Sequence, residues 1–264
     1  MKLHHLRNAT CVIESGSTHI LIDPMLSPKG ALPSFAYFRH RSVRNPTVPL
    51  PQGADQILDR VTHCLVTHSQ KWGIDLLTHT DHIDPTGQSF LKNNQIPVIC
   101  PRKDAGFMKK KGIPVEAELD YWKPHPLFGG EITAIPAQHG HGWTRHFMAN
   151  GAGFFIALPD EPTLYICGDT VYTDEVDRAL TQLKPDICVI PAGSASLDVG
   201  GPILMSLEEI ITFIRNAPGK VIANHLEALN HCPTTRLQLK AQLEKRGLLS
   251  KTIIPEDGQT IALS

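Results

Sequence analysis

The chain has 264 residues, of which 41% are hydrophobic and 19% are charged, and its formal net charge is −1. This composition supports a sizeable core and excludes an intrinsically disordered chain, and the length fits one α/β domain over residues 1–264. A chain this close to neutral has no excess of positive charge that would bind nucleic acid or an anionic membrane. No run of apolar residues approaches the roughly 18 residues of a membrane span. We therefore expect a small-molecule partner, and the oligomeric state stays open.

The cysteines indicate the cellular compartment. They are scattered without a C-x-x-C motif, and most lie in apolar runs, at Cys11, Cys64, Cys100, Cys167, Cys188 and Cys232. This pattern is typical of buried free thiols rather than a disulfide framework. The start of the chain also lacks the apolar core of a signal peptide. We expect a protein of the reducing cytoplasm.

Hydrophobic periodicity and turn residues predict alternating strands and helices. The first half is predicted to contain strands at 9–14 and 19–23, a strand at 62–67, a helix at 85–94, a strand at 96–100, a helix at 103–111 and a strand at 131–136. The second half is predicted to contain strands at 153–158 and 163–167, a helix at 174–183, a strand at 187–191, a helix at 207–216, a strand at 220–223, a helix at 234–246 and two final strands. This order favours two related α/β halves packed sheet to sheet, with helices outside.

Local signals mark two helix starts and one long loop. Asp84 before Pro85, and Ser206, are typical N-cap residues. Residues 27–51 are rich in proline, glycine and aromatic residues and predict a long loop, which is either a flap over a site or a structural wrap.

A dense group of metal-ligating residues precedes the first of these helices. His79, Asp81 and His82 lie within four residues. Neutral imidazole and ionised carboxylate are the usual nitrogen and oxygen ligands of a divalent metal such as zinc, manganese or iron. This spacing favours a metal site over a chance surface cluster.

Four predicted strands lead directly to further donors. They end at His68, His139, Asp169 and His225. The carboxyl ends of parallel strands meet along one edge of a sheet, where loops build sites. One such histidine would most simply be structural, but four strand ends together with the dense group favour a metal centre. Gly168 allows a close backbone approach just before Asp169.

Several segments carry a resemblance over nearly the whole chain. They are Ile20-Leu21-Ile22-Asp23-Pro24, His79 to His82 as H-x-D-H, Pro136-Ala137-Gln138-His139, residues 165–170 and His225-Leu226-Glu227. On these residues the chain resembles the metallo-β-lactamase superfamily, in particular its branch of hydrolases similar to L-ascorbate-6-phosphate lactonase. The resemblance implies an α/β fold, a four-layered αββα sandwich, with two divalent metal ions, zinc first, at one edge of the paired sheets.

The chain departs from the family pattern at one ligand. The family motif is H-x-H-x-D-H, and its first histidine falls here on Leu77. Either His68 takes that place and residues 69–78 form an insertion, which is the interpretation we favour, or the first ligand is lost and one metal position is weak.

The resemblance implies a ligand set and a chemistry. One metal would take His68, His79 and His139, and the other Asp81, His82 and His225, with Asp169 bridging both. A metal-bound hydroxide would then attack a lactone, ester or phosphoester of a small cytoplasmic metabolite, with Asp81 and Asp169 as catalytic carboxylates. Glu227 would fix the tautomer of a ligand histidine or serve as a surface ion-pair group. The alternatives are a phosphodiesterase or nuclease and a non-catalytic metal-binding protein.

Overall fold

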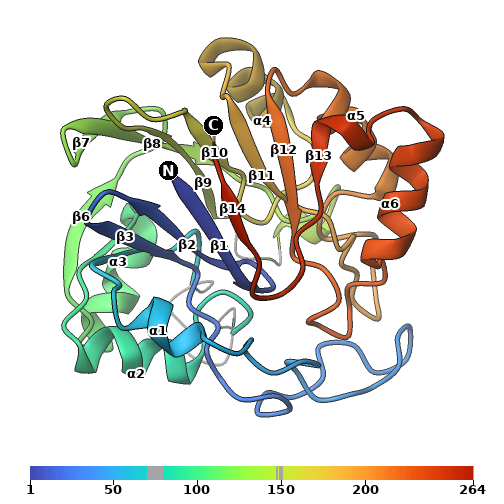
Figure 1. Cartoon of the computed structure of the whole chain (residues 1–264). Coiled ribbons are helices and arrows are strands. Elements are labelled where there is room, and N and C mark those ends of the chain that lie inside the picture. The colour runs from blue at the N-terminus through green and yellow to red at the C-terminus, as the bar shows by residue number, and fades with distance from the viewer. Residues whose placement is uncertain (70–79, 147, 149–150, 264) are drawn as a thin grey trace.

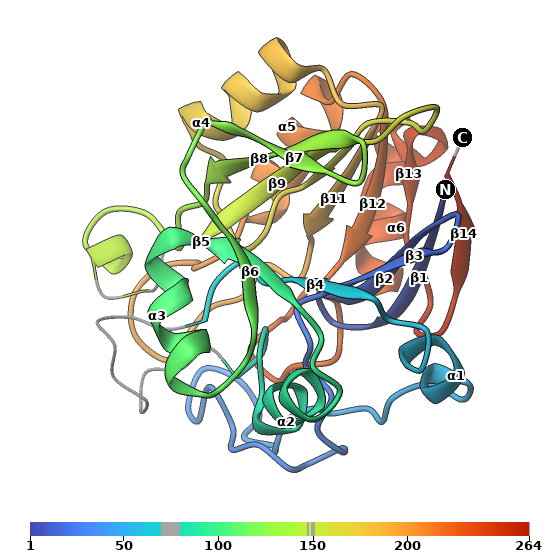
Figure 2. The same ribbon diagram turned by 90° about the vertical axis from the view of Figure 1, so that its left-hand side faces the viewer.

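The computed structural model describes the chain except for residues 70–79, 147, 149–150 and 264. Within the described residues, two seven-stranded sheets pack face to face, with helices on both outer surfaces (Figures 1 and 2). This is the predicted four-layered αββα sandwich. In the same part of the chain, no helix combines the length and the hydrophobicity needed to cross a bilayer.

The first sheet combines an antiparallel part with a parallel part. Its strands in spatial order are β14 (Thr260–Ala262), β1 (Lys2–Arg7), β2 (Thr10–Ser15), β3 (Thr18–Ile22), β4 (His63–Leu65), β5 (Val98–Pro101) and β6 (Val115–Leu119). The pairs from β14 to β3 are antiparallel, and those from β3 to β6 are parallel. Its outer face carries α1 (Ala54–Leu58), α2 (Pro85–Asn93) and α3 (Arg102–Lys110).

The second sheet is mixed in the same way. Its strands in spatial order are β13 (Thr252–Ile253), β12 (Lys220–Asn224), β11 (Ile187–Pro191), β10 (Leu164–Ile166), β9 (Ala152–Ala157), β8 (Gly130–Pro136) and β7 (Pro124–Leu127). The pairs from β13 to β10 are parallel, and those from β10 to β7 are antiparallel. Its outer face carries α4 (Asp174–Arg178), α5 (Leu207–Asn216) and α6 (Arg236–Lys245).

The alternation of side chains along each strand explains the layers. Ile20 and Ile22 of β3 face the core between the sheets, whereas Leu21 packs toward the helices outside. In β12, Ile222 faces inward, while Val221 and Ala223 contact the outer helices. Both faces are apolar because both are covered, which is why these strands are nearly continuous hydrophobic runs.

Helix starts follow their predicted caps. The Asp84 side chain accepts a hydrogen bond from Gly87 N at the start of α2, and Ser206 forms a reciprocal capping box with Glu209 at the start of α5. The predicted helix at 174–183 is α-helical only through Arg178 and then continues as a π-helical turn, Ala179–Leu183.

Three strands were not predicted from the sequence: β1, β6 and β7. The clearest case is β1, which is polar in sequence and yet buried at five of its six positions. Distant partners bind several of its polar groups: Arg7, which is fully buried, donates from its terminal guanidinium nitrogens to the carbonyl oxygens of Val48, Met25 and Ser27. The two final strands also join different sheets, since β13 pairs with β12 and β14 pairs with β1.

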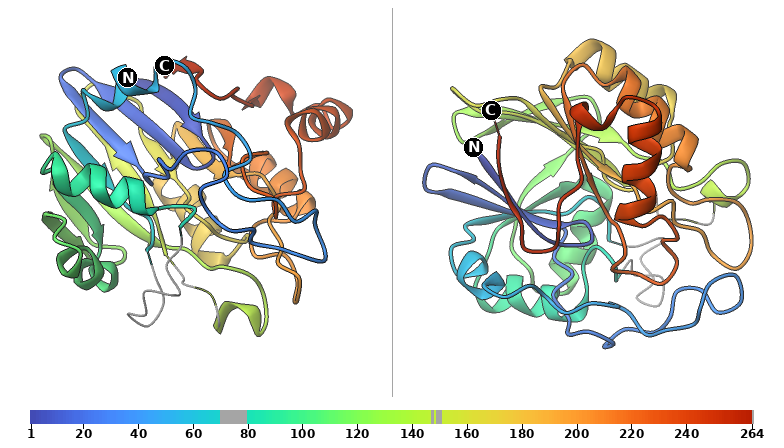
Figure 3. Two further views of the ribbon diagram at one scale, coloured as in Figure 1. Left: turned by 90° about the horizontal axis from the view of Figure 1, so that it is seen from below. Right: turned by 45° about the vertical axis from the view of Figure 1, so that its right-hand side comes forward.

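The loop at residues 27–51 runs beneath both sheets, from the side of α1 to the side of α6 (Figure 3). Two side chains of the second half fasten it. The Asp198 carboxylate accepts hydrogen bonds from the backbone N–H groups of Tyr37, Phe38 and Arg39, and Asn230 binds several groups between residues 34 and 45. The loop is therefore tied down along its length, as expected of a wrap, and it reaches the edge of the sandwich where the metal-ligating residues lie.

Candidate metal centre

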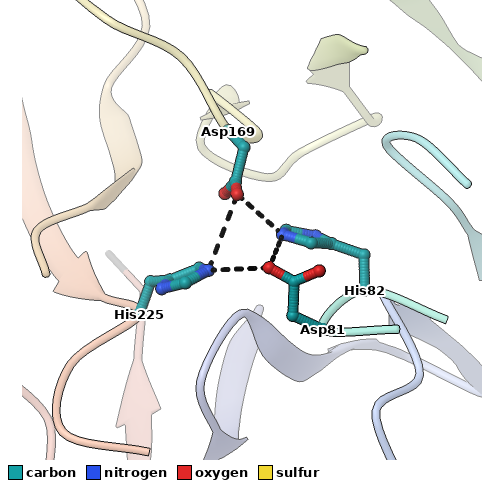
Figure 4. Close-up of side chains that lie close together, drawn as sticks. All are labelled: Asp81, His82, Asp169 and His225. Carbon is teal, nitrogen blue, oxygen red and sulfur yellow. Dashed lines mark ion pairs between the residues drawn. The ribbon is translucent and has the colours of Figure 1, made fainter. Parts of the chain in front are cut away.

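The predicted donors of the described residues meet at one edge of the sandwich. His68 follows β4 of the first sheet, whereas Asp169 and His225 follow β10 and β12 of the second. Asp81 and His82 lie just before α2. In Figure 4, the side chains of Asp81, His82, Asp169 and His225 converge from these separate segments.

One carboxylate oxygen occupies the middle of the cluster. Oδ2 of Asp169 lies 2.9 Å from Nε2 of His82, 3.5 Å from Nε2 of His139 and 3.6 Å from Nε2 of His225. Oδ2 of Asp81 lies 3.8 Å from Nε2 of His82 and 4.0 Å from Nε2 of His225. On the other side of Asp169, Nε2 of His68 lies 3.2 Å from Nε2 of His139.

These contacts form two donor groups that share Asp169. Asp81, His82, Asp169 and His225 form the first, and His68, His139 and Asp169 form the second; within each group all donor atoms lie within 4.8 Å of one another, and every member is buried. His79, which was expected in the second group, lies outside the described residues. The structure therefore places His68 beside His139 and Asp169, and whether it replaces the first family ligand stays a prediction.

The four histidines present the same ring nitrogen to the centre. In each, Nδ1 contacts an outer atom: Thr67 Oγ1 at 3.0 Å for His68, Asp23 Oδ2 at 2.8 Å for His82, Ile203 O at 3.2 Å for His139 and Cys232 Sγ at 3.5 Å for His225. Such outer contacts fix the tautomer and the orientation of metal-ligating histidines. Among the described residues, Nε2 of His225 has no hydrogen-bond partner, and Nε2 of His82 has only its ion-pair contact with Asp169. Buried imidazole nitrogens aimed at shared carboxylates fit a divalent metal.

Asp23 is the central support of the cluster. Besides contacting His82, its carboxylate accepts hydrogen bonds from the N–H and the hydroxyl of Thr67, both at 2.8 Å. It thereby joins the end of β3 to the end of β4, where His68 follows. Asp23 itself has a φ of 46°, a left-handed conformation that aspartate tolerates better than most residues.

The backbone around His68 is equally constrained. Asp104 of α3 accepts hydrogen bonds from the N–H and the hydroxyl of Ser69 at 2.9 and 2.7 Å. On the other side, a Cβ added to Gly151 would lie 2.8 Å from Cβ of His68. Gly168, with a φ of +63°, has the carbonyl of Ala152 at 2.6 Å from such an added Cβ. The close backbone approach that was expected at Gly168 is therefore to Ala152, at the start of β9.

Charges in the cluster act strongly on one another. Burial alone would lower the pKa of His82, but Asp169, Asp23 and Asp81 together hold it well above its usual value. Burial would raise the pKa of Asp169, but His82 and His225 hold it well below. For His139, burial dominates and lowers the pKa. Metal binds a neutral imidazole and an ionised carboxylate, so an ion at His82 would displace the proton that the three carboxylates otherwise favour there.

The structure supports the second of the two alternatives for Glu227, the ion-pair group, and two residues near the centre were not predicted. Glu227 does not contact a ligand histidine: its carboxylate accepts from the N–H of Arg236 at 3.1 Å and pairs with its guanidinium at 2.6 Å, at the start of α6. Asp23 and His231 were not assigned to the site from the sequence. The signal for Asp23 was its place at the end of a buried strand, like the other donors, whereas His231 lies in a loop without such a signal.

Comparisons with known proteins agree with this geometry. Residues 18–225 match the model of the β-lactamase superfamily domain. The chain is 31% identical to the UPF0173 protein YddR of Bacillus subtilis, over 98% of this chain and 99% of that protein. Among solved structures, it is similar to an isothiocyanate hydrolase from Delia radicum gut bacteria, with 31% identity, a TM-score of 0.87 and coverage of 100% of this chain and 99% of that one. It is also similar to a possible metal-dependent hydrolase from Veillonella parvula, with 28% identity, a TM-score of 0.88 and the same coverage.

Proposed function

The chain belongs to the β-lactamase superfamily and is a metal-dependent hydrolase of its UPF0173 group, and we propose that it hydrolyses a small neutral electrophile, first of all an isothiocyanate, at a centre of two metal ions. The observation that carries this proposal is the pair of buried donor groups that share Asp169. One group supplies two imidazoles and two carboxylates, and the other supplies two imidazoles and the shared carboxylate. Donors of this kind suit zinc first, with manganese or iron as alternatives.

Each residue of the centre has its own role in the proposed reaction. His68 and His139, with His79 from outside the described residues, would hold one ion; Asp81, His82 and His225 would hold the other, and Asp169 would bridge them. When bound, such ions lower the pKa of a coordinated water toward 7 and polarise the bond under attack. Asp169, with only 3% of its side chain exposed, would hold both ions in a fixed geometry of the protein's own, whereas Asp81, at 11%, is the carboxylate with more access to solvent. Asp81 is accordingly the group to orient the attacking water and to accept its proton.

An apolar cluster beside the centre suits an uncharged substrate. Its members are Met25, Ala195, Ile203, Leu204, Leu229 and Cys232, with Phe35, Met148 and Leu197 packed against them. Two of them touch the ligand histidines directly, Ile203 at His139 and Cys232 at His225. The organic group of an isothiocyanate is a hydrocarbon, and its N=C=S group has an electrophilic carbon. Addition of water to that carbon and loss of the amine give R–NCS + H₂O → R–NH₂ + COS.

The similarity to an isothiocyanate hydrolase at 31% identity over the whole chain supports this substrate class ahead of lactones, esters and phosphoesters. We also propose a cytoplasmic location, because the six cysteines are free and buried. A small-molecule substrate, without nucleic acid or membrane, is part of the same proposal.

The test combines metal analysis with turnover. Purified protein loaded with zinc, manganese or iron is assayed for amine release from benzyl isothiocyanate, and for hydrolysis of a γ-lactone, a 4-nitrophenyl ester and bis(4-nitrophenyl) phosphate. We expect two ions per chain and the highest kcat/KM for the isothiocyanate. Preference for the phosphodiester would favour the phosphodiesterase alternative, and tight metal binding without turnover of any substrate would favour a non-catalytic metal-binding protein.

A further inference from the structure

The buried imidazole of His231 belongs to neither donor group. The residue is 3% exposed, and no described residue forms a hydrogen bond with its Nδ1. His4, another buried histidine, uses both ring nitrogens, with Thr260 and Glu14 each at 2.8 Å. An unsatisfied buried nitrogen is costly, and a ligand or a water that bonds to Nδ1 of His231 would remove that cost.

His231 lies beside the metal centre. The next residue, Cys232, has its Sγ 3.5 Å from Nδ1 of His225. His231 is therefore adjacent in sequence to a residue that contacts one of the donor histidines. Burial lowers the pKa of His231 to about 4, and the charges of Asp81 and Asp169 are near enough to oppose that shift. The ring is therefore neutral at physiological pH and lies within the electrostatic field of the centre.

Hydrogen bonds from other segments hold the backbone at and before His231 in place. Asn230 donates from its N–H to Asn45 Oδ1 at 2.9 Å, and its own Oδ1 accepts from the N–H of Phe35 at 2.9 Å. The carbonyl of His231 accepts from the N–H of Ser196 at 3.0 Å. The Phe35 ring meets the imidazole edge to face, with the centroids 5.3 Å apart. His231 is thus held in place by contacts that do not use its Nδ1.

We propose that His231 is a substrate-contacting residue, whose neutral ring donates a hydrogen bond from Nδ1 to the nitrogen of the N=C=S group, while Phe35 packs against the hydrocarbon part. This rests on the proposed function. An isothiocyanate offers only acceptors, so the complementary tautomer carries the proton on Nδ1. Negative charge collects on the nitrogen as water adds to the central carbon, and a fixed donor there stabilises the transition state more than the free substrate. The loop at residues 27–51 takes part because Asn45 and Phe35 position the ring.

The test compares three variants of the metal-loaded full chain. His231→Phe keeps a ring but removes the donor, His231→Asn places an amide nitrogen near the position of Nδ1, and His63→Phe is the control, at the start of β4 against Phe128. With benzyl isothiocyanate, His231→Phe is expected to lower kcat/KM about 10- to 100-fold, the effect of losing a hydrogen bond to a group that becomes charged. His231→Asn should stay within a few-fold of the unaltered chain, and metal content should be equal in all of them.

A second measurement does not depend on turnover. Thiocyanate carries the same linear N–C–S group, and its binding to the cobalt-loaded protein is followed by visible absorption. The dissociation constant should rise by about 10-fold or more in His231→Phe, again from the lost hydrogen bond, and should not change in His63→Phe. If the unaltered chain does not hydrolyse isothiocyanates, the proposed function fails, and the thiocyanate titration still decides on His231. Equal thiocyanate affinity in His231→Phe and the unaltered chain overturns the inference, and so does loss of metal from His231→Phe.

Discussion

Replacing His68 by alanine tests the most unusual feature that we propose for the centre, a first metal ligand that follows β4. The change removes one of the three donors that the described residues place in the second group. Loss of an outer partner of a ligand typically costs 10- to 100-fold in metal affinity, so loss of a ligand should cost at least about 100-fold. A 100-fold weaker affinity corresponds to about 2.7 kcal/mol.

This loss should appear in thermal unfolding. Metal stabilises the folded state by RT ln(1 + [L]/Kd), so at the same excess of zinc the metal-dependent stabilisation falls by the same about 2.7 kcal/mol. For a protein of this size 1 kcal/mol shifts Tm by roughly 2–4 °C, and the zinc-induced rise in Tm should therefore be about 5–10 °C smaller in His68→Ala. Comparing each variant with and without zinc removes the cost of the cavity itself, and His63→Ala on the same strand serves as the control.

Metal content completes the measurement. We expect His68→Ala to lose one ion per chain and to retain the ion of the first group, because Asp81, His82 and His225 are untouched. An unchanged ion count together with an unchanged zinc-induced rise in Tm would show that His68 is not a ligand. The first family ligand would then be lost in this chain rather than replaced.

Three further changes probe the shared ligand, its support and a distant ion pair. Asp169→Asn should abolish binding of both ions and turnover while circular dichroism shows a folded core; full metal content in this variant would contradict the shared role. Asp23→Asn should weaken metal binding by about 10- to 100-fold, measured against a chromophoric chelator, because Asp23 orients His82; an unchanged affinity would make it a purely structural residue. Asp257→Asn should lower the free energy of unfolding at pH 7 by about 1.5–3 kcal/mol through its lost contact with Arg236. Burial opposes ionisation of Asp257, but His5 and Arg236 hold its pKa below the usual 3.8. Its stabilisation is therefore present above pH 3.8 and is lost as the pH falls through the folded-state value, so urea unfolding should show a weaker acid dependence between pH 5 and pH 2 in the variant. An identical acid dependence in both chains would contradict this account.

Much of this architecture was predictable because it depends on local sequence. The runs that form β3, β11 and β12 are short, apolar and end directly at turn residues or donors, and the caps at Asp84 and Ser206 need only a few neighbouring residues. The donors His68, His139, Asp169 and His225 could be predicted for the same reason, since each follows a buried strand and parallel strands align their carboxyl ends.

Features that depend on contacts between residues far apart in the chain became visible only in the tertiary structure. Strand β1 is buried although it is polar, and its Arg7 donates hydrogen bonds to the carbonyl groups of Met25, Ser27 and Val48. Glu227 is close to His225 in sequence, but its carboxylate pairs with Arg236, so proximity along the chain did not predict contact.

The same distinction holds inside the centre. The sequence indicated which residue types could bind metal, and its resemblance to a known family implied that Asp169 is shared between two ions. Only the folded chain determined that Nε2 of each described ligand histidine faces inward, that Asp23 holds His82, and that His231 lies beside the centre with Nδ1 unused. The physical reason is that a ring's orientation depends on the partner of its other nitrogen, and those partners come from strands and loops that meet only after folding.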